Sequence, residues 1–443
     1  MWKRGFHSST YCQVLRKPQF DVKCVIRDLA LHQSSIKRRQ IVGGPELLTR
    51  LQCISSQYEE ANQLDKTIAQ LQSKRKALEQ SLKKDRSLAR ELASELKHSK
   101  SEFQELNSRV STKRDEIQHV LQSLPNLIHK SVPDESPEVF RWIRPRASYD
   151  VDASLDHVEI MLNKGMADFQ TASNVTGNSW YYLLGKGAQL EYALVSFALN
   201  RASKAGFQFC IPPSIARNEI IDACGFRPRD MNGEQQIYHL QNTDQGLTAT
   251  AEIALAGYGA NKVMDLSHGP IQLVGTSRSY RAEAGARGKD TRGLYRVHEF
   301  TKVELFCWSK PEDSERILEK MRSLQIEIVD SLGLSAKVLN MPANDLGASA
   351  SQKYDIEAWM PGRGEFGEIT STSNCFDYQS RRMNTKYKNT DTGKLEYVHT
   401  LNGTAMAVPR VILAVVENGY NPVNDTIVIP ECLREFMGGQ AYI

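Results

Sequence analysis

Apolar side chains between residues 45 and 124 recur at intervals that alternate between four and three. The first series is Leu64, Ile68, Leu71, Leu78 and Leu82, with Arg75 in the intervening position. A second series continues the alternation from Leu92 to Leu124. This spacing is the a/d seam of a coiled coil, and prolines at positions 45 and 125 bracket it. The pattern predicts two antiparallel helices joined near residues 83–88.

The predicted turn of this hairpin carries many basic side chains. Seven fall within 17 residues, at Lys74, Arg75, Lys76, Lys83, Lys84, Arg86 and Arg90, against Glu79 and Asp85. A basic hairpin tip suits contact with phosphate groups, and the same composition is found on an ordinary solvated helix surface. Composition alone leaves both interpretations open.

The pattern changes downstream of the two helices. Residues 125–150 contain four prolines and are typical of a connection. A segment of strand character at 180–184 precedes a helical pattern at 190–201, and a strand pattern at 206–209 ends before two prolines. We expect a compact region of mixed strands and helices here, distinct from the hairpin.

Composition limits the class of protein. The chain has 443 residues, of which 40% are hydrophobic and 24% are charged, enough for two or three globular domains. It contains no run of 18 apolar residues, so no membrane span is expected. The eight cysteines are scattered without a CxxC pair, so neither a zinc site nor a disulfide framework is expected.

The net charge of +4 originates at the N-terminus. Residues 1–17 contain Lys3, Arg4, Arg16 and Lys17 and no acid, and the remaining chain has 52 basic and 52 acidic side chains. A basic, hydroxyl-bearing and acid-free segment is typical of a mitochondrial transit peptide, although a frayed basic terminus has the same composition. Because the rest of the chain is neutral, nucleic acid binding would depend on local patches.

Residues 280–305 carry the most specific chemistry. They read YRAEAGARGKDTRGLYRVHEFTKVEL, with a Gly-rich basic loop at 285–293 between two strand-like flanks. The flanks hold Arg281, Glu283, Arg296, Phe300 and Glu304. Arginine forks can hold phosphate and an aromatic face can hold a base, so this pattern can form a nucleoside triphosphate site without a P-loop. A basic hairpin with a core phenylalanine is the plain alternative.

Two other segments add carboxylates and hydroxyls. In LTATAEIAL, at 247–255, Thr250 and Glu252 would point the same way from a short strand and could flank a small zwitterion. In GEFGEITSTSN, at 364–374, Glu368 and Ser371 are three residues apart, so they need an irregular or helical turn to face one target. Their hard oxygen atoms suit Mg²⁺.

A further segment, LNGTAMAVPRVILAVVEN at 401–418, predicts a buried helix. Pro409 suits the first turn of this helix, and Arg410 is the only charge at its start. This segment resembles motif 3 of the class II aminoacyl-tRNA synthetases, and the segment at 280–305 resembles their motif 2. The helix at 190–201 with the strand at 206–209 resembles motif 1, which forms a dimer interface in that class.

The amino-acid sequence of these segments resembles that of seryl-tRNA synthetases, and the resemblance extends over roughly residues 20–443. The strings AEAG, DTRG and HEFTKVEL belong to that family, and VGTSRSYR and DIEAWMPGRGEFGE are most similar to its animal mitochondrial branch. Ala249 stands where the family usually has proline, and Ala405 and Pro409 stand where bacterial members usually have glycine.

The resemblance implies an α+β fold. An N-terminal antiparallel helical hairpin, a coiled-coil arm, would precede a class II catalytic domain built on an antiparallel sheet. The implied division is a transit peptide at 1–18, a tRNA-binding helical arm at 19–130 and the catalytic domain at 131–443. The arm residues expected to bind tRNA are Lys74, Arg75, Lys83, Lys84 and Arg86.

The resemblance also assigns roles within the catalytic domain. Arg281 and Arg410 would be catalytic, and Glu368 and Ser371 would hold the Mg²⁺ that accompanies ATP, with no zinc. The residues expected to bind ATP are Arg281, Ala282, Glu283, Arg296, Val297, Phe300, Glu368, Ile369, Thr370, Ser371 and Arg410. The residues expected to bind L-serine are Thr250, Ala251, Glu252, Glu304, Asn402 and Thr404.

The implied activity is that of a homodimeric serine–tRNA ligase in the mitochondrial matrix. ATP would activate L-serine to seryl-adenylate, and mitochondrial tRNA-Ser would accept the seryl group. One alternative is a catalytically silent paralogue in mitochondria that binds RNA or stabilises a partner, but every charged site position is occupied. Another is a coiled-coil structural protein, which predicts heptads beyond residue 125, and none are present.

Overall fold

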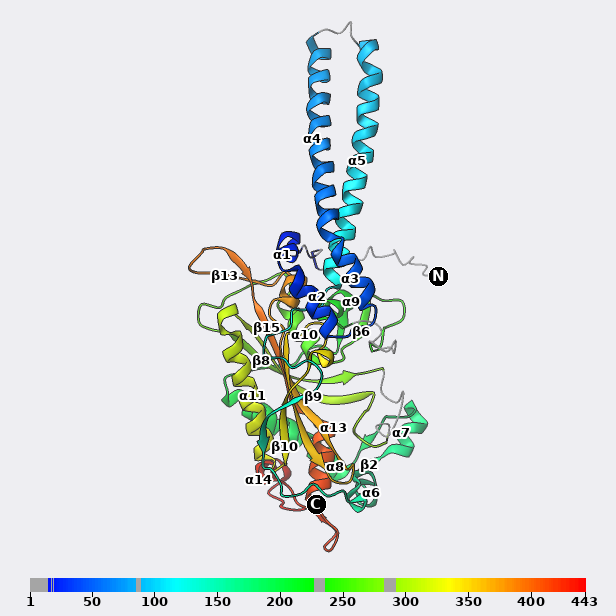
Figure 1. The fold of residues 1–443 in the computed structure, drawn as a ribbon. Coiled ribbons are helices and arrows are strands. Elements are labelled where there is room, and N and C mark those ends of the chain that lie inside the picture. Colours follow the sequence, from blue (N-terminus) through cyan, green and yellow to red (C-terminus); the bar gives the residue numbers. More distant parts are fainter. Residues whose placement is uncertain (1–14, 17, 19, 85–88, 227–235, 283–291) are drawn as a thin grey trace, which may run out of the picture. The chain divides into compact units, whose positions relative to one another are not determined.

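The computed structural model describes residues 15, 16, 18, 20–84, 89–226, 236–282 and 292–443 (Figure 1). These residues form two compact units. One unit comprises residues 19–127, and the other comprises residues 128–443 with the described residues before 19. Each unit has an apolar core of its own.

The described part of the first unit is entirely helical. It contains α1 (Val22–Arg27), α2 (Leu29–Arg38), α3 (Gly44–Gln52), α4 (Ile54–Lys84) and α5 (Ala89–Ser123). The long helices α4 and α5 run side by side (Figure 1). Salt bridges of 2.7 Å between Lys113 and Glu60 and of 2.8 Å between Lys74 and Glu95 join them in opposite chain directions. The predicted antiparallel hairpin is therefore confirmed.

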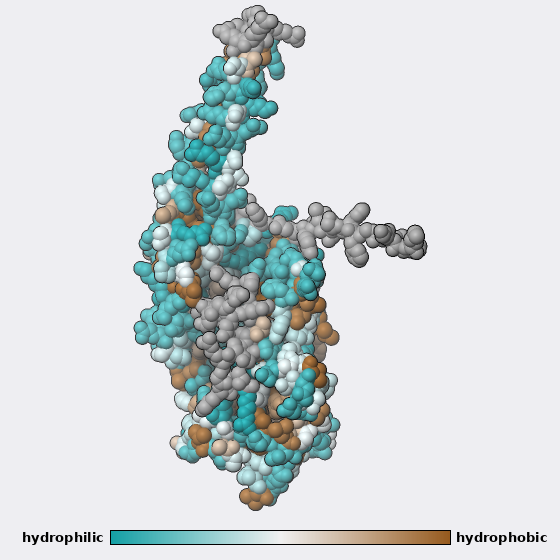
Figure 2. All heavy atoms as spheres, turned by 90° about the vertical axis from the view of Figure 1, so that its right-hand side faces the viewer, coloured by the Kyte–Doolittle hydropathy of each residue, from teal (hydrophilic) through white to brown (hydrophobic). Residues whose placement is uncertain are grey.

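Burial along the hairpin follows the predicted heptads. Ile68 is buried, and Leu64, Leu71 and Leu78 are half-buried while most positions between them are exposed. Arg75 is half-buried at the seam position that interrupts the apolar series. Outward-facing positions are polar, and the side of the arm drawn in Figure 2 is mostly hydrophilic. The seam holds the two helices together, because it provides most of their shared apolar surface.

The base of the arm differs in one detail from the predicted single helix. α3 ends at Gln52 and α4 begins at Ile54, so the helical pattern that starts at Pro45 is broken at Cys53. Leu51 and Ile54, on the two sides of the break, are both fully buried in a cluster with side chains of α1, α2 and α5. Packing into this cluster, rather than a proline or glycine, accompanies the break.

The second unit is built on a sheet of eight strands among the described residues. In spatial order they are β1 (Glu138–Ile143), β10 (Ala336–Asn340), β11 (Gln352–Met360), β12 (Glu365–Asn374), β15 (His399–Ala407), β9 (Glu299–Ser309), β8 (Ile271–Tyr280) and β4 (Gln208–Cys210). Neighbouring strands are antiparallel except for β4 and β8, which are parallel. The predicted α+β fold with an antiparallel sheet is confirmed.

Helices and short strands surround this sheet. The helices are α6 (His157–Asn163), α7 (Phe169–Thr176), α8 (Gly185–Lys204), α9 (Asn218–Ala223), α10 (Ala251–Tyr258), α11 (Ser314–Ser331), α12 (Tyr378–Met383), α13 (Val408–Gly419) and α14 (Glu431–Arg434). The short strands are β2 (Ala167–Asp168), β3 (Tyr182–Leu183), β5 (Ile215–Arg217), β6 (Gln245–Leu247), β7 (Val263–Met264), β13 (Lys386–Lys388), β14 (Leu395–Tyr397), β16 (Tyr420–Asn421) and β17 (Thr426–Ile427). None of the helices in the described ranges combines the length and apolar character needed to cross a membrane.

The central strand β9 serves two different cores because its side chains alternate between the sheet faces. Val303 and Leu305 join the larger core, to which α8, α11 and α13 contribute. Phe306 and Trp308 join a second core, which includes side chains of α9 and α10. Both faces of the sheet are thus covered at this strand, and any ligand site must lie where the covering helices leave a gap.

Candidate active site

The gap lies over the first half of β9, on the face of the second core. Phe300, Lys302 and Glu304 share the parity of Phe306, so they point to this face. The β8 residue paired with Phe300 is Ser279, whose short side chain is buried. An aromatic ring, a lysine and a carboxylate therefore stand in one row above the sheet.

A cavity of about 690 Å³ that is open to solvent lies above this row. Its wall comes from the end of β8, the start of β9, the middle of β12, the end of β15 and the start of α13. The lining residues are Arg281, Leu294, Tyr295, Arg296, Val297, Phe300, Lys302, Glu368, Ser371, Thr404, Ala407, Pro409 and Arg410. The lining residues fall within three segments that are distant in the sequence, between 281 and 302, 368 and 371, and 404 and 410, and these converge on one hollow.

Arg281 and Phe300 lie against each other at one wall of the cavity. The guanidinium carbon of Arg281 is 5.3 Å from the centre of the Phe300 ring. The backbone N–H of Arg281 donates to the carbonyl of His298 at 2.8 Å, which holds the end of β8 beside the start of β9. The pair presents a cation and a flat apolar face side by side, which suits a phosphate and an aromatic base.

Arg410 also lines the cavity, from the first turn of α13. Its Nε donates to the carbonyl of Tyr295 at 3.0 Å, and its Nη1 donates to the carboxylate of Glu368 at 3.1 Å. Pro409 precedes it in the first turn of the helix. A proline is tolerated there because an N–H group in the first turn has no acceptor within the helix. Loss of hydration acts to raise the pKa of Glu368, but Arg410, Lys353 and Arg281 outweigh this effect and hold it below its ordinary value.

A β-bulge in β12 aims Glu368 and Ser371 into the same cavity. In the pairing with β11, Thr370 faces Ile356 and Glu368 faces Glu357, so Ile369 has no partner of its own. One extra residue reverses the alternation, and two side chains three positions apart then point to one face. The irregularity expected from the spacing of Glu368 and Ser371 is this bulge.

A second, enclosed cluster of polar groups adjoins the cavity floor. Glu304 is 1% exposed, and its carboxylate is 2.8 Å from the ammonium of Lys302, a side chain that is 8% exposed. The hydroxyl of Thr404 donates to the same carboxylate oxygen, Oε2 of Glu304, at 3.3 Å. Because buried charges are costly without partners, this pair needs the hydrogen bonds that surround it.

Glu252 belongs to the same cluster. Its Oε1 accepts a hydrogen bond of 2.7 Å from the amide of Gln379, and Asn402 provides another hydrogen bond to its side chain. Burial and the nearby charge of Glu304 raise the pKa of Glu252 to about 7, against the opposing effects of Lys302 and the two amides. Two carboxylates and one ammonium thus share a single small volume.

Thr250 and Glu252 do not lie on a strand, and that prediction is wrong. Thr250 is the N-cap of α10, and its hydroxyl accepts a hydrogen bond of 3.2 Å from the backbone N–H of Glu252. The run after it, Ala-Glu-Ile-Ala-Leu-Ala, consists mainly of good helix formers, and a threonine N-cap favours the helix start. Glu252 points into the buried cluster from the first turn of this helix, and not through strand alternation.

The remaining predicted residues take varied positions. Arg296 and Val297 line the cavity, whereas Ala251, Ile369 and Thr370 are buried and do not belong to its wall. Ala282 donates its backbone N–H to the carbonyl of Gln236 at 3.1 Å. Glu283 lies outside the described residues, as does Arg86 of the arm.

The other arm residues belong to the first unit. Lys74 pairs with Glu95 at 2.8 Å, and Arg75 pairs with Glu79 at 3.0 Å. Lys83 and Lys84 are exposed in the last turn of α4. Salt bridges between exposed side chains contribute little to stability, so these basic side chains can exchange their acidic partners for phosphates.

Several residues of the site were not predicted from the sequence, and three of them contact predicted ones. Lys302 shares the strand parity of Glu304, and this i, i+2 relation could have identified it. The guanidinium carbon of Arg410 is 4.6 Å from the centre of the Tyr295 ring, and the backbone carbonyl of Tyr295 accepts a hydrogen bond from Arg410. A contact through a backbone carbonyl leaves no signal in the pattern of side chains. Gln379 reaches Glu252 from 127 positions away, beyond any local signal.

Comparison with known proteins identifies relatives of the whole chain. A model of the tRNA synthetase class II core domain (G, H, P, S and T) matches residues 238–419. The mitochondrial serine–tRNA ligase of Saccharomyces cerevisiae is 56% identical over 443 residues, which are all of this chain and 99% of that protein. The mitochondrial serine–tRNA ligase of Schizosaccharomyces pombe is 47% identical over 291 residues, 64% of this chain and 59% of that protein.

Solved structures share the fold over nearly the full length. A crystal structure of seryl-tRNA synthetase from Pyrococcus horikoshii complexed with ATP is 32% identical, with a TM-score of 0.85, and covers 96% of this chain and 99% of that one. A cytoplasmic serine–tRNA ligase from Naegleria fowleri in complex with AMP is 27% identical, with a TM-score of 0.80, and covers 97% of this chain and 99% of that one.

Proposed function

This chain belongs to the seryl-tRNA synthetase family, and from that premise we propose which part of the site holds each substrate of the serine–tRNA ligase reaction. The open cavity between Arg281 and Arg410 takes ATP, and the enclosed cluster around Glu304 takes L-serine. The observation that carries the proposal is that these two environments adjoin, sharing Lys302 and Thr404 on their common boundary.

The enclosed cluster has the charge and hydrogen-bonding groups needed for serine. Glu252 and Glu304 against Lys302 leave one net negative charge when both carboxyls are ionised, which one α-ammonium neutralises. Glu304 accepts from Thr404, and a serine hydroxyl in the same place would find an acceptor. A site that pairs a substrate hydroxyl rejects alanine, because its own buried acceptor would then remain unpaired.

The open cavity suits a triphosphate and a base. Arg281 and Arg410 would neutralise phosphate charge from two sides, and Phe300 would stack on adenine. Glu368 and Ser371 provide a carboxylate and a hydroxyl from one face of β12, a donor set that fits Mg²⁺ when phosphate oxygens complete its shell. Mg²⁺ bound there would neutralise charge on the phosphates during the reaction.

The reaction then needs alignment and charge neutralisation, and no protein nucleophile. The serine carboxylate oxygen attacks the α-phosphorus of ATP, the bond to the β-phosphate oxygen breaks, and pyrophosphate leaves. A ribose hydroxyl at the 3′ end of tRNA-Ser next attacks the seryl carbonyl and releases AMP. Arg281 lies where negative charge develops on the α-phosphate, and Arg410 holds the leaving end.

The basic end of the arm is the proposed contact for tRNA. Lys83 and Lys84 extend from the exposed last turn of α4, where a phosphate backbone can approach. Mutating both to glutamate should lower kcat/KM for serylation of mitochondrial tRNA-Ser transcripts about tenfold at low salt and leave pyrophosphate exchange unchanged. The matched control is glutamate at Lys97 and Lys100, which are exposed on α5. Equal loss in both double variants would contradict a contact at the tip.

A second copy of the chain is the proposed partner for the face around β4. This strand is the last in the order of the described sheet. Its residue Phe209 is 59% exposed, Ile211 just after it is 93% exposed, and Tyr192 of α8 is 75% exposed. Apolar side chains gathered at a sheet edge are typical of an interface. Light scattering should give the mass of a homodimer, and Ile211→Asp should shift it towards the monomer.

The mitochondrial matrix is the proposed location. The relatives from two fungi are both named mitochondrial, and the acid-free segment 1–18, almost all of it outside the described residues, has transit-peptide composition. Fusion of residues 1–18 to a fluorescent reporter should direct it to the matrix, and a fusion in which the basic residues are replaced by glutamine should remain outside.

The direct test of the activity is serine-dependent exchange between pyrophosphate and ATP. The purified enzyme should catalyse exchange with L-serine and at least a hundredfold more slowly with L-alanine. It should then transfer radiolabelled serine to a tRNA-Ser transcript. Absence of exchange with serine, in protein that is folded and binds ATP, would refute the proposal in favour of a silent paralogue.

A further inference from the structure

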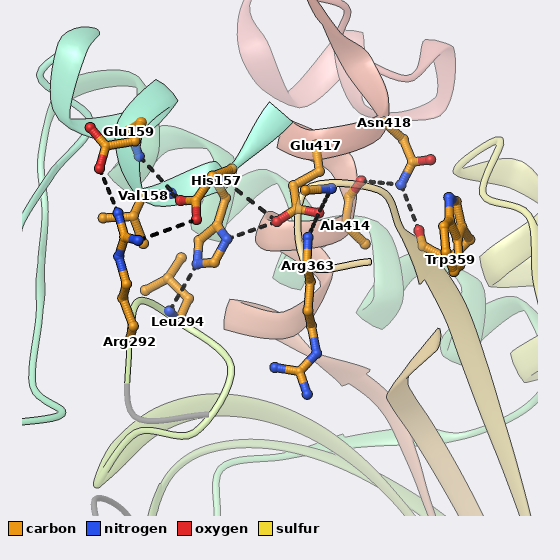
Figure 3. A network of polar contacts seen from close by, with 12 residues as sticks. His157, Val158, Glu159, Arg292, Leu294, Trp359, Arg363, Ala414, Glu417 and Asn418 are labelled. Atoms are coloured by element: carbon orange, nitrogen blue, oxygen red, sulfur yellow. Dashed lines mark hydrogen bonds and ion pairs between the residues drawn. The ribbon is translucent and has the colours of Figure 1, made fainter. Parts of the chain in front are cut away.

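A buried histidine–carboxylate pair lies beside the nucleotide cavity without forming part of its wall (Figure 3). His157, the first residue of α6, is 6% exposed, and its Nδ1 is 2.9 Å from Oε1 of Glu417 in the last turns of α13. The backbone N–H of Leu294 donates to Nε2 of the same ring at 3.2 Å. Since Nε2 accepts, the neutral ring carries its proton on Nδ1 and donates it to Glu417.

The other oxygen of Glu417 holds a separate segment. Oε2 accepts hydrogen bonds from the backbone N–H groups of Gly362 and Arg363, at 2.8 and 3.1 Å. The guanidinium of Arg363 in turn lies 3.6 Å from the centre of the Tyr295 ring. The Glu417 side chain is completely buried, so each of its contacts replaces a hydrogen bond to water.

Residues 292–294 are fitted closely onto α6. Gly293 has φ +76°, and a Cβ at this position would lie 2.2 Å from Nε2 of His157 and 2.6 Å from Cγ2 of Val158. Both the backbone conformation and the close approach therefore require glycine here. Next to it, Arg292 pairs with Glu159 at 2.5 Å, an exposed ion pair. The chain is thus held against α6 immediately before it enters the cavity wall.

This attachment leads directly to the ATP half of the site. Leu294 and the three residues that follow it all line the cavity. The carbonyl of the next residue, Tyr295, accepts a hydrogen bond from Nε of Arg410. A shift of Leu294 would therefore move Tyr295 and, through this hydrogen bond, Arg410. The groups around Glu304 and Glu252 come instead from β9, β15, α10 and α12.

We propose that His157 and Glu417 are positioning residues for the nucleotide half of the site, and that they act through Leu294 and Tyr295 on Arg410. This inference rests on the proposed function insofar as ATP is the ligand of that half. Loss of the hydrogen bond from Leu294 to the ring should weaken ATP binding and leave serine binding unchanged, whereas loss of the bond to Glu417 alone should have a smaller effect. A merely structural role would change the melting temperature and both substrates together.

Two substitutions of His157 separate the two hydrogen bonds of the ring. An asparagine amide reaches about as far as Nδ1 and can donate to Glu417, whereas a glutamine amide reaches about as far as Nε2 and can accept from Leu294. His157→Asn should raise KM for ATP about tenfold and change KM for serine less than twofold. His157→Gln should retain a KM for ATP within about threefold of the wild-type value, because the bond to Leu294 is kept.

Further variants keep the test decisive if His157→Asn folds poorly. Gly293→Ala strains the backbone at φ +76° and places a Cβ against His157 and Val158, so it should raise KM for ATP in the same direction. Asn163→Ala, at the exposed end of the same helix and away from residues 292–294, should leave both KM values unchanged. The proposal is overturned if KM for ATP stays constant in His157→Asn and Gly293→Ala, or if both substrates weaken equally.

Binding of ATP alone separates this inference from the proposed function. Calorimetric titration of the full-length chain with ATP and Mg²⁺, without serine, should give a Kd about tenfold higher for His157→Asn than for the wild type. If the wild type lacks serine-dependent exchange but this difference in Kd is found, the positioning role stands and the ligase assignment fails. Equal Kd values would overturn the positioning role whatever the exchange assay shows.

Discussion

The two halves of the site manage charge in opposite ways. In the nucleotide half the ionic groups are partly exposed: the Glu368 side chain is 43% exposed and the Arg410 side chain 19%. In the amino-acid half the Lys302 and Glu304 side chains are 8% and 1% exposed. The first half can exchange its internal ion pairs for the charges of a large polyanion, while the second keeps a fixed arrangement that only a small ligand of matching polarity can complete.

This difference explains where selectivity resides. Salt bridges between hydrated groups are weak, so Arg410 can leave Glu368 for a phosphate at little cost. Buried ionic groups have no such freedom, because an unmatched charge or hydrogen-bonding group in an enclosed site is strongly unfavourable. On the proposed assignment, the open half would promote the reaction through its charges, and the enclosed half would select the amino acid.

The largest expected effect breaks the open half. Arg281→Ala removes a cation at the α-phosphate and the contact with Phe300, and should lower kcat/KM for serine-dependent exchange about a thousandfold. Circular dichroism and the melting temperature should remain near the wild-type values. Arg316→Ala, which removes an exposed arginine of α11 paired with Asp313, is the control. Normal exchange in Arg281→Ala would exclude this arginine from the reaction.

The next effect tests the enclosed half without changing its net charge. Replacing Lys302 and Glu304 together by methionine removes one cation and one anion, and the remaining carboxyl, Glu252, keeps its hydrogen bond from Gln379. Exchange with serine should fall about a hundredfold while exchange with alanine changes far less. KM for ATP is the internal control and should stay within about threefold of the wild-type value. Retained preference for serine would show that the hydroxyl is read elsewhere.

A third effect separates the halves by pH. Burial and Glu304 raise the pKa of Glu252 to about 7, so below this pH the carboxyl is neutral in the empty site and cannot pair with an ammonium. KM for serine should therefore rise towards about tenfold per unit as pH falls below 7, whereas KM for ATP should not follow this curve. Glu252→Gln should flatten the profile. A pH-independent KM for serine in the wild type would contradict the assignment.

The same shift has a consequence for stability. Because the pKa of Glu252 in the folded chain lies above its unfolded value, folding favours the protonated form. Its contribution to stability is greatest below the unfolded pKa and is lost as pH rises through about 7, where the carboxyl ionises. Bound serine would compensate that loss, so the stabilisation by serine should be larger at pH 8 than at pH 6.

The smallest expected effect lies at the boundary of the open half. Ser371→Ala removes one hydroxyl donor from the proposed Mg²⁺ site and should raise the Mg²⁺ concentration for half-maximal exchange about threefold. Ser373→Ala, two positions further along β12, is the control because Ser373 does not line the cavity. Equal Mg²⁺ dependence in both variants would remove Ser371 from the metal site.

Most of the fold and much of the site could be predicted from local sequence patterns. The coiled-coil seam is a strict heptad pattern, and burial follows it residue by residue. Arg281, Phe300, Glu368 and Arg410 lie in segments whose residue types and spacing are unusual enough to indicate the family. The need for an irregular turn between Glu368 and Ser371 followed from strand periodicity alone.

The remainder depends on tertiary context that no window of sequence contains. The alternation of Thr250, Ala251 and Glu252 predicts a strand, whereas the N-cap hydrogen bond of Thr250 and the helix formers after it decide the conformation. His157 and Glu417 are 260 positions apart and each looks ordinary in its own segment. Only the folded chain shows that one ring nitrogen supports the wall of the nucleotide cavity.

The alternation along β9 has a genetic consequence. Tolerance to substitution between residues 302 and 305 should oscillate with a period of two, because Val303 and Leu305 fill the larger core while Lys302 and Glu304 face the proposed substrate site. Odd positions should accept other aliphatic residues, while even ones should accept almost no change of chemical type. In a saturation-mutagenesis experiment on this strand, the tolerated substitutions at odd positions would therefore report on core packing, and those at even positions on the chemistry of the site.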